Sequence, residues 1–226
     1  MRFRFLLRGG WLAAGLGLLP AGTAWAQLLP DSARLVLKAE LVPLLKHSYA
    51  VQAEYRLARL LSLTLTPQVV AGTVPSSVST TANAAGDQVR GYGCSLGPRL
   101  YLPGTSNQGV QLDGLYVSVQ AAYQHLRLHY QQAAWGEDLA PDGLRYYVFR
   151  DRDFLETIAR YGGVATLGYQ TEVFHPRLRL DMSASLNRFS SHSSVSGDTR
   201  YNSSPGDYAN PDNYLSLNLS LGFSLK

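Results

Sequence analysis

A strict alternation of apolar and small polar residues near the C-terminus limits most strongly what this chain can fold into. In NYLSLNLSLGFSL (residues 213–225), large apolar side chains occupy every second position from Leu215 to Leu225. Serine, asparagine and glycine occupy the positions between them. Neighbouring side chains of an extended strand point to opposite faces. The segment therefore predicts a β-strand with one apolar face and one uncharged polar face.

The same alternation recurs in seven earlier segments. They cover residues 33–42, 49–57, 61–69, 92–102, 115–130, 162–173 and 177–189. Most are close to the roughly 9–11 residues that a tilted membrane-spanning strand needs. The alternation changes phase near Gln124, which predicts a β-bulge. Pro98 predicts a bulge or a strand end, because proline lacks the amide that a ladder requires.

The first 26 residues have the pattern of a secretory signal peptide. Three arginines precede an apolar run over residues 9–19, and the segment ends in Ala-Trp-Ala at 24–26. This order predicts export with cleavage after Ala26. The apolar run is too short for a transmembrane helix, which needs about 20 residues. We therefore expect residues 1–26 to be a signal peptide and residues 27–226 to form one barrel domain. The only cysteine is Cys94, so no cysteine stands at the cleavage point to carry a lipid anchor.

The charge of the exported chain gives no reason to expect a nucleic-acid partner. Loss of the signal peptide lowers the count of Lys and Arg from 20 to 17, against 16 Asp and Glu. The basic character of the full sequence thus comes largely from the signal peptide. A single cysteine also excludes an intramolecular disulfide, so backbone ladders and side-chain packing must hold the fold together.

The lengths of the connections between the predicted strands indicate which end of the barrel faces outward. The segments 74–87, 131–161 and 190–212 are long and polar, and they fall on one side of an up-and-down barrel. Short connections fall on the other side. Bacterial membrane barrels have long loops outside the cell and short turns in the periplasm. We therefore predict three long extracellular loops, and both chain ends on the periplasmic side.

The polar strand faces predict which side of the barrel contacts water. A soluble barrel places charged residues on its exterior, whereas a membrane barrel faces lipid with its apolar side and fills its interior with polar side chains. The apolar faces of these strands carry no charge. The polar faces carry charges of both signs close together, which predicts lumenal pairs Lys38–Glu40, Glu54–Arg56 and Arg179–Asp181. Three tyrosines near strand ends are candidates for interfacial girdles: Tyr49, Tyr92 and Tyr214.

The chain resembles the small eight-stranded outer-membrane β-barrel proteins of Gram-negative bacteria. GPRLYLPG (97–104) followed by GLYVSVQAAYQ (114–124) is similar to a strand-turn-strand unit of that family. GGVATLGYQ (162–170) and the alternating C-terminal strand resemble it too. The resemblance implies an eight-stranded antiparallel up-and-down transmembrane barrel in contact with outer-membrane lipids. It also implies insertion by the barrel-assembly machinery. The C-terminal residue is Lys226 rather than an aromatic residue, so recognition by that machinery would rest on Phe223 and Leu225.

One serine-rich segment contains residues that could carry out hydrolysis. In RFSSHSSVSGD (188–198), His192 and Ser194 share a strand face and could form a base and a nucleophile, with Asp198 or Asp207 orienting the imidazole. The His-x-Ser order resembles that of lipid A deacylase barrels. The asparagine expected after the serine is replaced by Val195, and the following loop has no glutamate. A serine-rich outer loop without activity explains the same residues.

The remaining residues predict no metal site and no cofactor. His125 and His129 share a face, but on a strand they lie roughly 13 Å apart, which is too far for one ion. Cys94 falls on the lipid face and is expected to act as a small apolar side chain. The acidic segment WGEDLAPDG (135–143) lacks the alternating oxygen ligands of a calcium loop, and we interpret it as an exposed loop tip.

The sequence therefore predicts a non-enzymatic envelope protein of the outer membrane with a filled polar lumen. An eight-stranded barrel is just wide enough for its own side chains, so bulk transport is not expected. Its role would be structural, adhesive or ligand-binding, through the loops 74–87, 131–161 and 190–212. Two alternatives remain. One is a lipid A hydrolase that uses His192, Ser194 and Asp198, and the other is a soluble lipocalin-like carrier in the periplasm.

Overall fold

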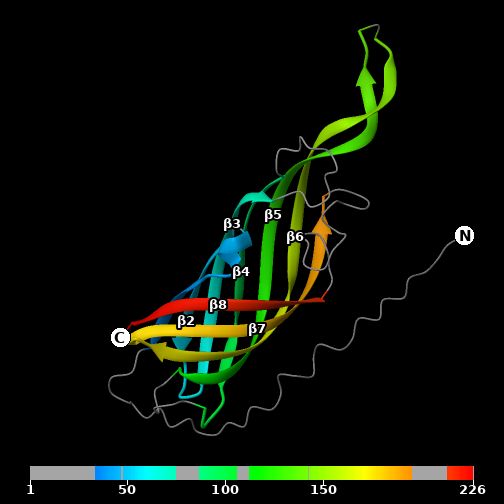
Figure 1. Ribbon diagram of the computed structural model, residues 1–226. Helices are drawn as coiled ribbons and strands as arrows, with labels where there is room; N and C mark the ends of the chain where they lie inside the picture. Colours follow the sequence, from blue (N-terminus) through cyan, green and yellow to red (C-terminus); the bar gives the residue numbers. More distant parts are fainter. Residues whose placement is uncertain are drawn as a thin grey trace, which may run out of the picture. The chain divides into compact units, whose positions relative to one another are not determined.

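Eight antiparallel strands form a closed barrel, which confirms the predicted fold class (Figure 1). The computed structural model describes residues 34–46, 48–74, 87–105, 112–141, 143–194 and 213–225. The predicted signal peptide lies outside these residues. Each strand pairs with its neighbours in sequence, and β8 pairs with β1 to close the ring. The strands are β1 (Leu35–Glu40), β2 (Ser48–Arg56), β3 (Leu61–Val74), β4 (Asp87–Tyr101), β5 (Gly114–Leu139), β6 (Arg145–Val173), β7 (His175–Ser193) and β8 (Asn213–Leu225).

The helical content of the described residues is one short turn. The 3₁₀ helix η1 (Pro43–Lys46) connects β1 to β2. No described helix is long and apolar enough to cross a membrane.

An uncharged apolar belt covers the outside of the barrel. Within the barrel, the outward side chains of each strand are exposed or half-buried and the inward ones are buried or half-buried, as a period of two requires. The outward positions of the belt carry no Asp, Glu, Lys or Arg. Its large exposed members include Leu37, Val51, Tyr55, Leu63, Leu65, Val69, Leu96, Leu100, Val117, Val119, Leu167, Met182, Leu186, Leu215, Leu217, Leu221 and Phe223.

The polarity of the outward and inward strand faces changes above a ring of four outward tyrosines: Tyr49, Tyr92, Tyr123 and Tyr161. Beyond this ring, the outward residues of β4 and β5 are polar, and many inward residues are apolar, although Asp87 and Glu156 are also buried there. The inward group packs as one cluster made of Val70, Val89, Leu126, Leu128, Tyr130 and Ile158, with Phe154 against it. The upper part of the barrel thus has an apolar cluster in its interior and polar outward residues on β4 and β5, the reverse of the arrangement below the ring. We call the level of the tyrosine ring the boundary.

This inversion explains the phase change near Gln124, and the predicted bulge is wrong. The register of β5 with β4 and with β6 is unbroken through Gln124. The side chains keep alternating, but the chemistry of the two faces is exchanged, so the apolar residues change sides without any change in the backbone. Pro98 likewise lies inside β4, opposite Leu63, with the same register on both sides of it. The register irregularity that is present lies between Glu172 and Val173.

The prediction of a long loop over 131–161 is also wrong. β5 and β6 run through this segment and pair continuously from Gly114 with Gln170 to Leu139 with Arg145. They extend past the other strands as a two-stranded arm, formed by residues 131–139 and 145–153 (Figure 1). Charged and aromatic residues occupy both of its faces, so the segment lacks the simple alternation that identified the other strands. The predicted loops at 74–87 and 190–212 do lie between strands, except that β7 continues to Ser193. Residues 75–86 and 195–212 lie outside the described residues.

Candidate functional site

Four charged side chains meet inside the lower barrel, near the start of β1 and the end of β8. Lys38 Nζ lies 2.6 Å from Glu54 Oε2 and 2.7 Å from Asp181 Oδ2. Arg99 Nη1 lies 3.1 Å and 2.8 Å from the same two oxygens. All four side chains are buried. Two cations and two carboxylates therefore form a balanced group, which we call the charge cluster.

Neutral polar residues complete the hydrogen bonds of the charge cluster. Ser62 and Tyr101 donate to Glu54 Oε1 at 2.6 Å and 2.7 Å. Tyr116 donates to Asp181 Oδ1 at 2.6 Å, and the Arg99 guanidinium stacks over its ring. Gln170 accepts from Lys38. Buried charges are tolerated when they are paired and hydrogen-bonded. Both carboxylates of the cluster meet these conditions, whereas Arg99 Nε is buried and donates no hydrogen bond among the described residues.

Two glycines make room for the cluster. A Cβ atom at Gly222 of β8 would collide with the Lys38 side chain and with the carbonyl of Leu37. A Cβ atom at Gly168 of β6 would collide with the Tyr116 ring. The charge cluster, its hydrogen-bond partners and these two glycines together come from all eight strands, and they fill the lumen at this level.

The ion pairs differ from those expected from the sequence. Lys38 pairs with Glu54 and Asp181, and not with Glu40, the neighbour on its own strand. Arg179 pairs with Glu172 at 2.7 Å instead of Asp181. Residues two apart on one strand lie along the barrel wall, whereas the side chains that meet come from different strands: Glu54 from β2, Asp181 from β7, and Glu172 from β6, directly opposite Arg179. Arg99 is central to the cluster, although it has no oppositely charged neighbour two residues away on its own strand to indicate a pairing.

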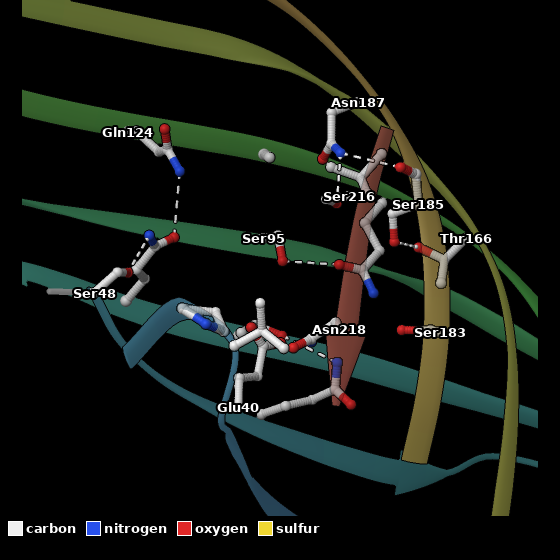
Figure 2. Close-up of a pocket in the computed structure, with 18 of the residues that line it drawn as sticks. Glu40, Ser48, Ser95, Gln124, Thr166, Ser183, Ser185, Asn187, Ser216 and Asn218 are labelled. Carbon is white, nitrogen blue, oxygen red and sulfur yellow. Dashed lines mark hydrogen bonds between the residues drawn. The ribbon is translucent and has the colours of Figure 1, made fainter. Parts of the chain in front are cut away.

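A polar cavity of about 540 Å³ lies in the barrel interior beside the charge cluster. Hydroxyl and amide side chains from β6, β7 and β8 project into it, with Glu40 on the β1 side (Figure 2). Its lining contains two acidic and two basic residues, so it is neutral overall. Among its lining hydrogen bonds, Asn187 donates to Ser216 at 2.8 Å and Ser95 donates to Gln120 at 2.8 Å. One predicted girdle residue, Tyr214, lines this cavity rather than the outer surface, and its ring stacks with Phe189.

The residues considered for hydrolysis are not assembled into a site by the described part of the chain. His192 and Ser194 point outward at the upper end of β7, where both are exposed. The Ser194 hydroxyl accepts a hydrogen bond from the Thr157 amide at 2.9 Å. No hydrogen bond links His192 to Ser194 among the described residues. Asp198 and Asp207 lie outside the described residues.

The other candidate ligands also lie on the outside. His125 and His129 are both on the outward side of β5, and His129 Nε2 lies 3.7 Å from Asp153 Oδ1. In the described ranges, no group of three or more His, Cys, Asp or Glu residues could hold a metal ion. Cys94 is exposed on the outward face of β4.

The arm formed by β5 and β6 carries an aromatic face. Trp135 and Phe149 are directly opposite each other, and their rings lie 5.4 Å apart. Tyr147 and Leu139 share this face, and these two side chains and Trp135 are 68–73% exposed. The opposite face carries ion pairs of Asp138 with Arg150 and Arg152, each at 3.0 Å. The sequence prediction of an exposed segment here is thus right about exposure but wrong about conformation.

Comparison with known proteins finds similarity only at the level of structure. The sequence matches no protein-family model and no curated protein. The N-terminal β-barrel domain of Pseudomonas aeruginosa OprF is 14% identical, with 86% of this chain and 100% of that chain covered and a TM-score of 0.37. Acinetobacter baumannii CarO is 14% identical, with 85% and 98% covered and a TM-score of 0.41. Acinetobacter baumannii CarO2 is 15% identical, with 86% and 100% covered and a TM-score of 0.39. Similarity this low says nothing about what the lumen or the arm of this chain binds.

Proposed function

We propose that this protein is a non-enzymatic barrel of the bacterial outer membrane that makes contacts outside the cell through its β5–β6 arm. The observation that carries the proposal is the inversion of polarity at the boundary. Below the boundary the outward face is apolar and uncharged while the interior is mostly polar; above it the outward residues of β4 and β5 are polar and an apolar cluster fills much of the interior. This arrangement is what a barrel needs if its wall passes from lipid into water at the boundary.

The alternative of a soluble carrier requires a different surface. Such a barrel would expose to water the whole belt of leucine, valine, methionine and aromatic side chains. Contiguous exposed apolar patches beyond a few hundred Å² are rare on soluble monomers and mark contact with lipid or protein. The charges that would make the exterior soluble lie instead in the lumen, where Lys38, Glu54, Arg99 and Asp181 are buried. A lipid-facing barrel is therefore the better supported reading.

The arm is the part of the described structure best suited to binding a partner. An isolated two-stranded ribbon is only marginally stable in water and leaves both of its edges unpaired. This ribbon also exposes Trp135, Tyr147 and Phe149 on one face. Tryptophan and tyrosine are enriched where proteins bind each other. A second surface that covers the aromatic face would stabilise the arm and bury these rings.

Chymotrypsin added to intact cells tests both the location and the orientation of the barrel. We expect cleavage within residues 135–149, because the aromatic residues there are exposed on a ribbon with little tertiary protection. The belt residues should be protected, since lipid covers them. Mass spectrometry of the fragments identifies the cut sites. A variant in which a short Asn-Gly turn replaces residues 131–153 is the matched control, and it should yield none of these fragments.

The pattern of fragments decides between the readings. Cleavage in the arm of intact cells, with the belt left whole, supports the proposed location and topology. Cleavage only after the outer membrane has been permeabilised would place the arm inside the cell envelope and contradict the proposal. A soluble periplasmic carrier would also be released from cells together with the periplasmic fraction.

A further inference from the structure

Above Glu40, strand pairing between β1 and β8 ends among the described residues, and we call this gap in the pairing the opening. β1 and β8 pair from Leu35 with Leu225 to Glu40 with Ser220, and the Leu41 amide then donates to the Leu219 carbonyl at 2.8 Å. Beyond this point β8 continues upward to Asn213, held only by β7 on its other edge. The chain of β1 turns into η1 before β2 begins. Residues 213–218 of β8 therefore have no described strand on their β1 side.

Backbone polar groups point into this opening. Within an antiparallel strand, the amide and carbonyl of every second residue point toward the same neighbouring strand. Leu219 directs its carbonyl toward β1, so Leu217 and Leu215 direct their amides and carbonyls toward the same edge. These groups have no backbone partner among the described residues. In hydrocarbon, each unsatisfied group of this kind costs several kcal/mol.

The opening lies on the lipid side of the boundary. Leu186 and Leu215 form the last outward apolar pair of β7 and β8, and Arg188 and Asn213 form the first polar pair above it. Leu215 and Leu217 are 71% and 68% exposed. If the barrel is in the outer membrane, as proposed above, the opening therefore faces the outer leaflet.

The polar cavity extends to both sides of the opening. Its lining includes Glu40, Val42 and Pro43 on the β1 side, and residues 215–218 on the β8 side. In Figure 2, Ser216 and Asn218 project into the cavity from β8, with Glu40 across from them on β1. A volume of about 540 Å³ falls within the usual range of small-molecule sites, about 300–1,000 Å³.

The chemistry of the lining selects for an uncharged ligand with hydroxyl groups. Most of the polar lining residues are Ser, Thr, Asn and Gln, and the four charged ones balance. The Oδ1 atom of Asn218 is buried and accepts no hydrogen bond among the described residues. A ligand hydroxyl can donate to this oxygen and to the carbonyls at the rim, and it can accept from the rim amides.

We propose that the opening admits an amphiphile with an uncharged, polyhydroxylated head group and a single alkyl chain from the outer leaflet. The head group occupies the cavity and hydrogen-bonds to Asn218 and to the backbone of Leu215 and Leu217. The alkyl chain leaves between β8 and η1 and lies against the outward leucines. Binding involves no covalent step.

The test is an NMR titration of the protein in phosphatidylcholine nanodiscs. The probe is n-octyl-β-D-glucoside, added below its micellar concentration and followed through backbone amide chemical shifts. Octan-1-ol has the same chain without the sugar, and octyl sulfate has the same chain with a charged head. We expect saturable shifts at Ser216, Asn218 and Asn187 with the glucoside, and not with the other two amphiphiles.

Two tryptophan variants of the same strand provide the matched comparison. Ser216→Trp fills the mouth of the cavity and should raise the dissociation constant for the glucoside at least about tenfold. Phe223→Trp adds an indole to the outward face of β8, where β1 is paired, and should leave it unchanged. A heat-dependent shift in gel mobility verifies that each variant is folded.

Each result of the titration supports or overturns the inference. Equal shifts with all three amphiphiles would show that the alkyl chain alone binds, and an absence of saturable shifts would show that the cavity holds only water. Either result overturns the inference while the protein remains inserted in the nanodisc. Failure to insert would instead overturn the proposed function, so the two failures are distinguishable.

Discussion

Replacement of Lys38 by methionine should destabilise the folded barrel by about 3–5 kcal/mol, because it leaves a buried charge without compensation. Glu54 and Asp181 would then share a single cation, Arg99, in a part of the lumen from which water is excluded. Methionine has nearly the shape of the lysine stem, so the change removes the charge with little change in packing. Urea-induced unfolding of the protein in phospholipid vesicles measures the loss.

A second substitution separates the effect of charge from the effect of shape. Lys38→Met combined with Asp181→Asn restores a balanced pair, Arg99 with Glu54, and the Tyr116 hydroxyl can still donate to the asparagine oxygen. The double variant should therefore lose less stability than Lys38→Met alone. If Lys38→Met alone were as stable as the wild type, the charge cluster would not contribute to closing the lumen.

Leu65→Arg should cost about 2–4 kcal/mol of folding free energy in a membrane, the penalty for an arginine on the lipid face near the bilayer midplane. Leu65 is an outward residue in the middle of the belt on β3, and it is 43% exposed. On a soluble barrel, a charge at such a position would meet water, and the substitution would have little effect. Denaturant titration of the protein folded into vesicles gives the free energy.

Thr73→Arg is the control, because it places the same side chain on the same outward face of β3. Thr73 lies beyond the boundary and is exposed, so the added guanidinium would be in water. We expect a change of less than about 0.5 kcal/mol, as for most surface substitutions. Similar small effects at Leu65 and Thr73 would argue that lipid does not cover the belt.

The alternation of side chains was sufficient to predict that there are eight strands and which face of each is apolar below the boundary. It identified the apolar face of β8 from Leu215 to Leu225, and that face is exposed in the barrel except at the half-buried Leu219. The signal works because a period of two is a local property of an extended backbone. It also predicted eight strands, and hence the closed ring.

Long-range contacts could not be predicted in the same way. Lys38 and Asp181 lie on β1 and β7, and they meet only because the barrel closes with a particular register between all of its strands. A local pattern contains no information about that register. The pairs expected from sequence proximity, such as Lys38 with Glu40, were wrong for this reason.

Two errors arose where the surroundings of a strand change along its length. At Gln124 the two faces of β5 exchange polarity, which in the sequence looks the same as an extra residue in the strand. In the arm, ladder hydrogen bonds hold β5 and β6 together without a core on either side, so both faces can carry charged residues such as Asp138 and Arg150. Both features are expected where a strand leaves lipid. From the sequence pattern alone, the exchange of polarity cannot be distinguished from a bulge, and the arm cannot be distinguished from a loop.

Spin-label accessibility along β5 tests most directly whether the apolar belt contacts lipid. In a Cys94→Ser background, single cysteines at Val117, Ala121, Arg127 and His129 place labels on the outward face, two below the boundary and two above it. We predict that the first two labels are accessible to oxygen, which partitions into lipid, and that the last two are accessible to a water-soluble nickel complex. Accessibility to the nickel complex at all four positions would contradict the account, because the belt would then face water.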